Sequence, residues 1–192
     1  MKKSFGATTL AFPTPAWLVG SYDKDGKPNI MTIAWGGICC SNPPMITVSL
    51  QKPRHTYQAI LDRGGYTISV PGESQVAQTD FAGITSGRNV DKFAACGFTP
   101  VKSELVDAPY VAECPMVIEL KLVKTVELGV HTQFIGEVLD VKVEEGCLDE
   151  KGNPDMAKVR PILFGPSARS YHGVGDFLGQ AFSIGKTVKE TL

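Results

Sequence analysis

The chain has 192 residues, of which 43% are apolar and 20% are charged, and its formal net charge is -1. This length can bury a sizeable core within one domain, and no run approaches the roughly 18 apolar residues that a membrane span requires. The balanced charge lacks the broad basic field of a nucleic-acid-binding protein, so an anionic ligand would need a local site.

The N-terminal segment Met1–Gly6 is basic, but the apolar region and cleavage site of a secretory signal do not follow it. We therefore expect a cytoplasmic protein that binds neither nucleic acid nor a membrane. No internal repeat or linker divides the sequence. The expected organisation is a single domain over residues 1–192, with a C-terminal extension from about residue 173 that is rich in glycine.

Short apolar runs separated by turn residues predict strands in the first part of the chain. Pro43 and Pro44 force an extended turn between two of these runs. Gly64 and Gly65 permit a left-handed cap after a segment with apolar residues at helical spacing. The predicted elements are a strand at 16–22, a turn at 23–28, a return arm at 29–40, a strand at 45–50 and a helix at 55–63.

The second part of the chain contains two long alternating stretches, Met116–Leu128 and Thr132–Val143, that predict an antiparallel pair in a barrel. A polar, glycine-containing stretch at 83–89 predicts a loop. The other predicted elements are a strand at 66–70, short helices at 75–81 and 91–95, and a final strand at 160–171. Together the elements indicate one mostly β, barrel-like domain with a few inserted helices.

Several short motifs follow one another in order along the chain. They are Gly26–Trp35, Ser41–Pro44, Val48–Leu50, Arg54–Thr56, Asp80–Gly83, Ser86–Arg88, Asp91–Phe93, Ala108–Pro109 and Gly136–Val138. This succession resembles the flavin reductase-like family of FMN-binding split barrels, and more narrowly the flavoredoxins. The resemblance covers nearly the whole chain. It implies a six-stranded antiparallel split β-barrel, bound FMN and a homodimer with the flavin near the subunit interface.

An FMN phosphate needs cations, hydroxyl groups and backbone N–H groups at a helix N-terminus. Arg54 and Thr56 stand at the start of the helix predicted over 55–63, and His55 lies between them. A second arm of the same cradle would come from Ser86, Gly87, Arg88 and Lys92. The alternative is that these basic residues are ordinary solvated charges.

For the flavin ring, the resemblance implies a border formed by the strand that contains Thr32, a second segment after Val48, and a loop at 41–42. Trp35 has an alternative role as a core or dimer-interface aromatic residue. The complete set of residues expected to bind the cofactor is Asn29, Met31, Thr32, Ile33, Ala34, Trp35, Cys40, Ser41, Asn42, Ser49, Leu50, Lys52, Arg54, His55, Thr56, Ser86, Gly87, Arg88, Lys92 and Phe93.

His131 is the one candidate catalytic residue, on the side where nicotinamide would bind. Many members of the family carry Gly-Asp-His before the strand that ends Gly-Glu-Val, whereas this chain has Gly129-Val130-His131. The acidic partner is missing, so the alternative for His131 is a strand-end residue without a catalytic role. His172 could reach the flavin of the partner subunit or simply be exposed.

The five cysteines have no C-x-x-C spacing, and the three histidines form no local pair, so no metal site is expected. Cys39 and Cys40 are interpreted as buried small residues because neighbouring side chains on a strand point to opposite faces.

The sequence leaves two main candidate functions. The first is an oxidoreductase that passes electrons from NAD(P)H through FMN to an acceptor, with the cofactor supplying the chemistry. The alternative is an FMN electron carrier served by redox protein partners; an FMN module without a redox role is a third option.

Overall fold

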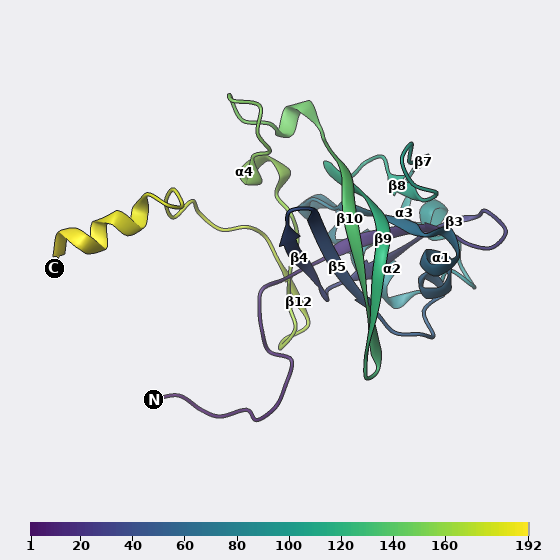
Figure 1. The fold of residues 1–192 in the computed structure, drawn as a ribbon, viewed down its shortest axis with the longest axis horizontal. Coiled ribbons are helices and arrows are strands. Elements are labelled where there is room, and N and C mark those ends of the chain that lie inside the picture. Colours follow the sequence, from purple (N-terminus) through teal and green to yellow (C-terminus); the bar gives the residue numbers. More distant parts are fainter. Residues whose placement is uncertain (192) are drawn as a thin grey trace.

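The computed structural model describes residues 1–191, and its main sheet has seven strands in the order β3-β2-β6-β9-β10-β5-β4. Every neighbouring pair in this sheet is antiparallel. Figure 1 shows the long β9–β10 hairpin crossing the barrel and α1 at one of its ends. The strands are β2 (Trp17–Tyr22), β3 (Pro28–Ile33), β4 (Gly36–Ser41), β5 (Pro44–Leu50), β6 (Gly65–Val70), β9 (Met116–Leu128) and β10 (His131–Val143).

The barrel interior is filled by apolar side chains from alternate positions of neighbouring strands. Val19, Ile68, Leu120 and Phe134 are fully buried there. Tyr57 of α1 packs edge-on against the Phe134 ring, with 5.1 Å between the ring centroids. This contact anchors the helix, and with it the loop that precedes the helix, to the core.

The return arm predicted over 29–40 is wrong, because the chain turns a corner at Ala34 and Trp35 and continues as a separate strand. A Cβ atom on Gly36 would lie 2.9 Å from the Trp17 ring, so this corner accepts only glycine without rearrangement. At the corner, the Trp35 carbonyl accepts a 2.8 Å hydrogen bond from the Ser49 amide. The mostly β antiparallel prediction is confirmed, with seven strands in the main sheet where six were expected, because the arm is two strands.

Three helices pack outside the sheet. The helix predicted over 55–63 is confirmed as α1 (His55–Arg63), and Gly64 closes it at a φ of 66°. The second predicted helix is longer than expected, with a 3-10 turn at Glu73–Gln75 followed by α2 (Val76–Ile84). The third is α3 (Lys92–Cys96), capped by the Asp91 carboxylate, which accepts from the Ala94 amide at 3.1 Å.

A second, three-stranded sheet lies beside the barrel, in the order β1-β11-β12. The single final strand predicted over 160–171 is wrong, because a turn divides it into β11 (Leu163–Gly165) and β12 (Ser170–His172). Arg169 ends that turn with a φ of 53°, which local sequence pattern does not reveal. The remaining elements are β1 (Thr14–Pro15), β7 (Pro100–Lys102), β8 (Pro109–Val111), a 3-10 turn at Glu145–Cys147 and α4 (Met156–Val159).

Beyond β12, the chain extends away from the barrel as the C-terminal extension predicted from about residue 173, and a 3-10 segment forms at Ile184–Thr191 (Figure 1). Phe177, Leu178 and Phe182 are exposed on it. The assignment of the whole chain to a single domain stays a prediction. No helix in the described part of the chain is long and apolar enough to cross a membrane.

Candidate functional site

A cavity of about 290 Å³ opens at the N-terminus of α1, between the loop that precedes the helix and the loop that follows α2. Seven residues predicted for the phosphate cradle meet there, although the chain brings them from two separate segments. They are Arg54, His55, Thr56, Ser86, Gly87, Arg88 and Lys92. Met31 of β3 also lines this cavity, so the cradle adjoins the strand predicted to border the flavin ring.

The three strongly basic residues of the cradle, Arg54, Arg88 and Lys92, have no carboxylate paired with them among the described side chains. Lys92 is only 3% exposed, and its Nζ donates a 2.6 Å hydrogen bond to the Ala82 carbonyl. The Arg88 guanidinium donates to the Pro53 carbonyl at 2.9 Å. No ion pair among the described side chains involves Arg54, Arg88 or Lys92. Such an arrangement is suited to an anion supplied from outside the chain.

Burial, together with the nearby positive charge of Arg54, lowers the pKa of Lys92 from 10.5 to about 8. Burial also lowers the pKa of His55, and Arg88 and Lys92 add to this effect while Asp23 opposes it. Both perturbed groups therefore respond to a local excess of positive charge in a partly dry environment.

Neutral groups complete the cradle. The Asn29 amide donates to the Thr56 hydroxyl at 2.9 Å, while Asn29 Oδ1 is buried without a hydrogen-bond partner. A Cβ atom on Gly87 would lie 2.1 Å from this Oδ1, so only glycine at position 87 lets the backbone of the loop come this close to Asn29. The side chain of Arg54 does not cap α1, which leaves first-turn N–H groups for an anion. These features fit a phosphate group.

The strand predicted to border the flavin ring lines a second cavity, of about 480 Å³. Thr32, Ala34 and Trp35 form one wall, and α2 and the β11–β12 hairpin form the others. The Thr32 hydroxyl donates to the Thr79 carbonyl of α2, and a Cβ atom on Gly83 would meet Thr32 at 3.2 Å. The two cavities therefore lie on the same strand and the same end of α2.

Sequence reasoning missed nine of the twelve residues that line the second cavity, and four of these supply its polar and aromatic side chains on α2 and the hairpin: Asp80, Phe164, Arg169 and Tyr171. Asp80 belongs to one of the motifs that carry the family resemblance, which was a signal for its position. The other three come from the β11–β12 hairpin. Its arrival beside α2 depends on pairing with β1, far away in the sequence.

Several predicted cofactor residues are core residues in the structure. The side chains of Ile33, Leu50 and Phe93 are at most 4% exposed and pack in the two apolar clusters. Only their backbone could face a ligand. Ser49 is half-buried on β5, and exposed Lys52 forms a 2.9 Å ion pair with Glu127.

Cys40, Ser41 and Asn42 line neither of the two cavities. They lie at the β4–β5 turn, at the end of β5 opposite to the cradle. The interpretation of Cys39 and Cys40 as buried residues is wrong: Cys39 is exposed and Cys40 is half-buried. The reason is that β4 is an outer strand of the sheet order, whose pattern resembles that of a covered strand.

His131 begins β10 at the tip of the β9–β10 hairpin and is half-buried, outside both cavities. Val130, which occupies the position of the family's acidic residue, is 75% exposed. His172 is exposed, and its Nε2 lies 2.8 Å from the Ser170 hydroxyl.

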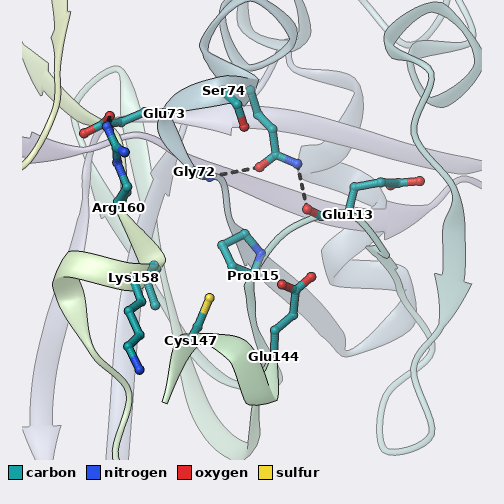
Figure 2. Close-up of a pocket in the computed structure, with 11 residues that line it drawn as sticks. Gly72, Glu73, Ser74, Glu113, Pro115, Glu144, Cys147, Lys158 and Arg160 are labelled. Carbon is teal, nitrogen blue, oxygen red and sulfur yellow. Dashed lines mark hydrogen bonds and ion pairs between the residues drawn. The ribbon is translucent and has the colours of Figure 1, made fainter. Parts of the chain in front are cut away.

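A third cavity, of about 600 Å³, contains none of the predicted residues (Figure 2). The Gln75 side chain accepts from the Gly72 amide at 2.9 Å and donates to the Glu113 carbonyl at 2.8 Å. Arg160 is engaged by the Glu73 carboxylate. These polar groups satisfy one another, which indicates a structural role for this part of the chain.

Residues 9–170 match the family model described as flavin reductase like domain. The chain therefore belongs to the flavin reductase-like family, as its motifs predict.

Among solved structures, it is similar to the flavoredoxin of Desulfovibrio vulgaris (Miyazaki F), with 59% identity, coverage of 96% of this chain and 100% of that one, and a TM-score of 0.93. It is also similar to the flavoredoxin from Methanosarcina acetivorans, with 33% identity, coverage of 97% and 100%, and a TM-score of 0.89. The split-barrel fold and the narrower resemblance to flavoredoxins are confirmed. A ferric-chelate reductase (NAD(P)H) from Archaeoglobus fulgidus is 31% identical over 104 residues, which are 54% of this chain and 60% of that protein.

Proposed function

We propose that this protein binds one FMN per chain and uses it to pass electrons from NAD(P)H to an acceptor. The observation that carries the proposal is the cradle, in which Arg54, Arg88 and buried Lys92 surround the N-terminus of α1 without a paired carboxylate. Membership of the flavin reductase-like family and the similarity to two flavoredoxins support FMN as the ligand.

In this proposal, Lys92 and Arg54 hold the phosphate by charge-assisted hydrogen bonds, and Gly87 lets the backbone come close to it. The segment from Thr32 to Trp35 borders the isoalloxazine ring, with backbone N–H groups available to its polar edge. FMN, when bound, supplies the two-electron chemistry. The chain's own contribution is to fix the ring's position, to present one face to the electron donor and to exclude part of the water.

A second candidate is an electron carrier that exchanges electrons with protein partners and has no NAD(P)H turnover of its own. The absence of an acidic residue before His131 favours it, because nothing on the neighbouring position orients that imidazole. The NAD(P)H-dependent relative from Archaeoglobus fulgidus favours the first candidate.

The cofactor is tested by flavin absorbance of the purified protein, with one FMN per chain as the expected result. Colourless protein that takes up no added FMN would contradict the proposal. Anaerobic mixing of the loaded protein with NADH and with NADPH then separates the two candidates. Rapid bleaching by either nucleotide supports the oxidoreductase, and bleaching only by a reduced protein partner supports the carrier.

A homodimer with the flavin near the interface belongs to the same proposal. Cys40, Ser41, Asn42 and His131 lie outside the cavities of their own chain, so a partner subunit is the route by which they would approach a flavin. Sedimentation equilibrium of the loaded protein measures the assembly, and a monomer at micromolar concentration would leave these four residues without a role at the cofactor.

A further inference from the structure

The second cavity, defined above by β3, α2 and the β11–β12 hairpin, has a mixed lining. Its volume of about 480 Å³ lies in the range of small-molecule sites. Apolar surface is supplied by Trp35, Ile84 and Phe164, which offer flat or branched side chains to a planar ligand. Only Asp80 and Arg169 bring ionisable charge to this lining near neutral pH.

One oxygen of the Asp80 carboxylate is already engaged within the protein. The Tyr171 hydroxyl donates a 2.9 Å hydrogen bond to Asp80 Oδ1 and so joins the hairpin to α2. Burial and the Asp80 carboxylate raise the pKa of Tyr171 to about 12, so the phenol keeps its proton and its donor role across the physiological range. The Phe164 and Tyr171 rings pack at 5.6 Å and hold the hairpin wall in shape.

Arg169 differs from Asp80 because its charged group has no partner among the described residues. No ion pair or side-chain hydrogen bond among the described residues involves its guanidinium, although the residue lines the cavity. Its backbone has a φ of 53°, a conformation that residues other than glycine rarely adopt.

We propose that the second cavity binds a small, planar and largely apolar molecule that carries one anionic group, and that Arg169 recognises that group. A guanidinium matches a carboxylate, sulfonate or phosphate by paired hydrogen bonds, whereas a neutral amide offers it less. The role of this ligand as an electron donor or acceptor rests on the proposed function. This cavity lies on the face of β3 that carries Thr32, whereas Met31, which points to the opposite face, lines the cradle. A ligand in the second cavity would therefore adjoin a flavin anchored in the cradle without occupying the cradle, in the place of an electron donor or acceptor.

The test is calorimetric titration of FMN-loaded protein with 2-naphthoate and with its neutral isostere 2-naphthamide. We expect the natural chain to bind naphthoate on the order of tenfold more tightly, a modest preference because the guanidinium is exposed. Arg169→Gln is expected to bind both compounds equally, and Arg169→Lys to retain part of the preference.

The matched control is Arg160→Gln. Arg160 has a similar backbone conformation, with a φ of 48°, but lines the third cavity, so this variant should keep the full preference. Failure of the natural chain to bind naphthoate, equal binding of the two compounds, or a preference that survives in Arg169→Gln would each overturn the inference.

Two further outcomes separate this inference from the proposed function. Protein that takes up no FMN but still distinguishes naphthoate from naphthamide through Arg169 would contradict the proposed function and leave the inference standing. Competitive displacement of naphthoate by FMN would mean that the cavity is the ring's own slot. That result would overturn the inference while supporting the cofactor.

Discussion

Replacing Lys92 by methionine is expected to stabilise the empty protein and to weaken its binding of FMN. The pKa of Lys92 is lowered from 10.5 to about 8, and each pKa unit corresponds to about 1.4 kcal/mol, so burying this charge costs about 3 kcal/mol at neutral pH. The variant also loses the hydrogen bond to the Ala82 carbonyl, a loss of about 1 kcal/mol. A net gain of about 2 kcal/mol remains, which corresponds to about 4–8 °C in the thermal unfolding midpoint.

The affinity for FMN should change in the opposite direction. A charge-assisted hydrogen bond to phosphate contributes about 1.5–3 kcal/mol, so Lys92→Met should raise the dissociation constant by about 10- to 150-fold. Quenching of FMN fluorescence on binding measures this constant, and differential scanning calorimetry of the flavin-free protein measures the midpoint. Lys24→Met, at an exposed lysine in the turn after β2, is the control and should change neither quantity.

The effect on stability has a defined pH window. The folded pKa of Lys92 is lower than the unfolded one, so the unfolded chain binds more protons between about pH 8 and 10.5. The stability of the natural protein therefore rises with pH through this window, and the advantage of Lys92→Met disappears. An unchanged FMN affinity in the variant would refute the assignment of Lys92 to the phosphate. A lower midpoint at pH 7 would refute the cost assigned to its charge.

Three other substitutions test the cradle and the core. Gly87→Ala places a Cβ atom 2.1 Å from Asn29 Oδ1, so we expect at least tenfold weaker FMN binding by fluorescence titration, and an unchanged value would show that the loop gives way freely. Arg54→Ala removes an exposed cation and should weaken FMN binding by about tenfold at low salt and less at high salt, whereas an effect independent of salt would contradict a phosphate contact. Phe134→Ala empties a fully buried position and should lower the free energy of unfolding by about 3–5 kcal/mol in urea titrations, while a loss below about 1 kcal/mol would exclude it from the core.

Elements whose signals are local were predicted well. The bounds of α1 follow from apolar spacing and from Gly64, whose left-handed conformation ends the helix wherever the rest of the chain lies. The two arms of the long hairpin β9–β10 were likewise predicted to within one residue, because their alternation persists over many positions. Both cases depend on information carried within the element itself.

Elements that are defined by contacts distant in the sequence were not predicted well. The corner at Ala34 and Trp35 separates β3 from β4, and it is fixed by contacts of the neighbouring Gly36 with the Trp17 ring and of Trp35 with strand β5. The turn before β12 similarly depends on the hydrogen bond from Tyr171 to Asp80, which spans 91 residues. In both places the strand pattern continues across the break, so periodicity alone predicts one strand where the structure has two.

The candidate site divides in the same way. The cradle could be predicted because an anion site needs cations, a helix start and a glycine, and these stand in recognisable order at Arg54–Thr56 and Ser86–Arg88. The β11–β12 hairpin that forms one wall of the second cavity could not be predicted, because neither Arg169 nor Tyr171 belongs to a motif. Ile33 and Phe93 belong to the family motifs although their side chains lie in the core, because such motifs contain both residues that bind a ligand and residues that support them.

The net charge of -1 and the basic cradle are compatible because charge acts at short range in a partly buried site. Arg54 lowers the pKa of Lys92, so the empty cradle is destabilised by its own cations. An anion that enters the cavity relieves this repulsion, raises the pKa of Lys92 towards its ordinary value and draws a proton onto it above about pH 8. In the proposed function, the affinity for phosphate and the instability of the empty site therefore have one physical origin, which is why a single substitution at Lys92 should move them in opposite directions.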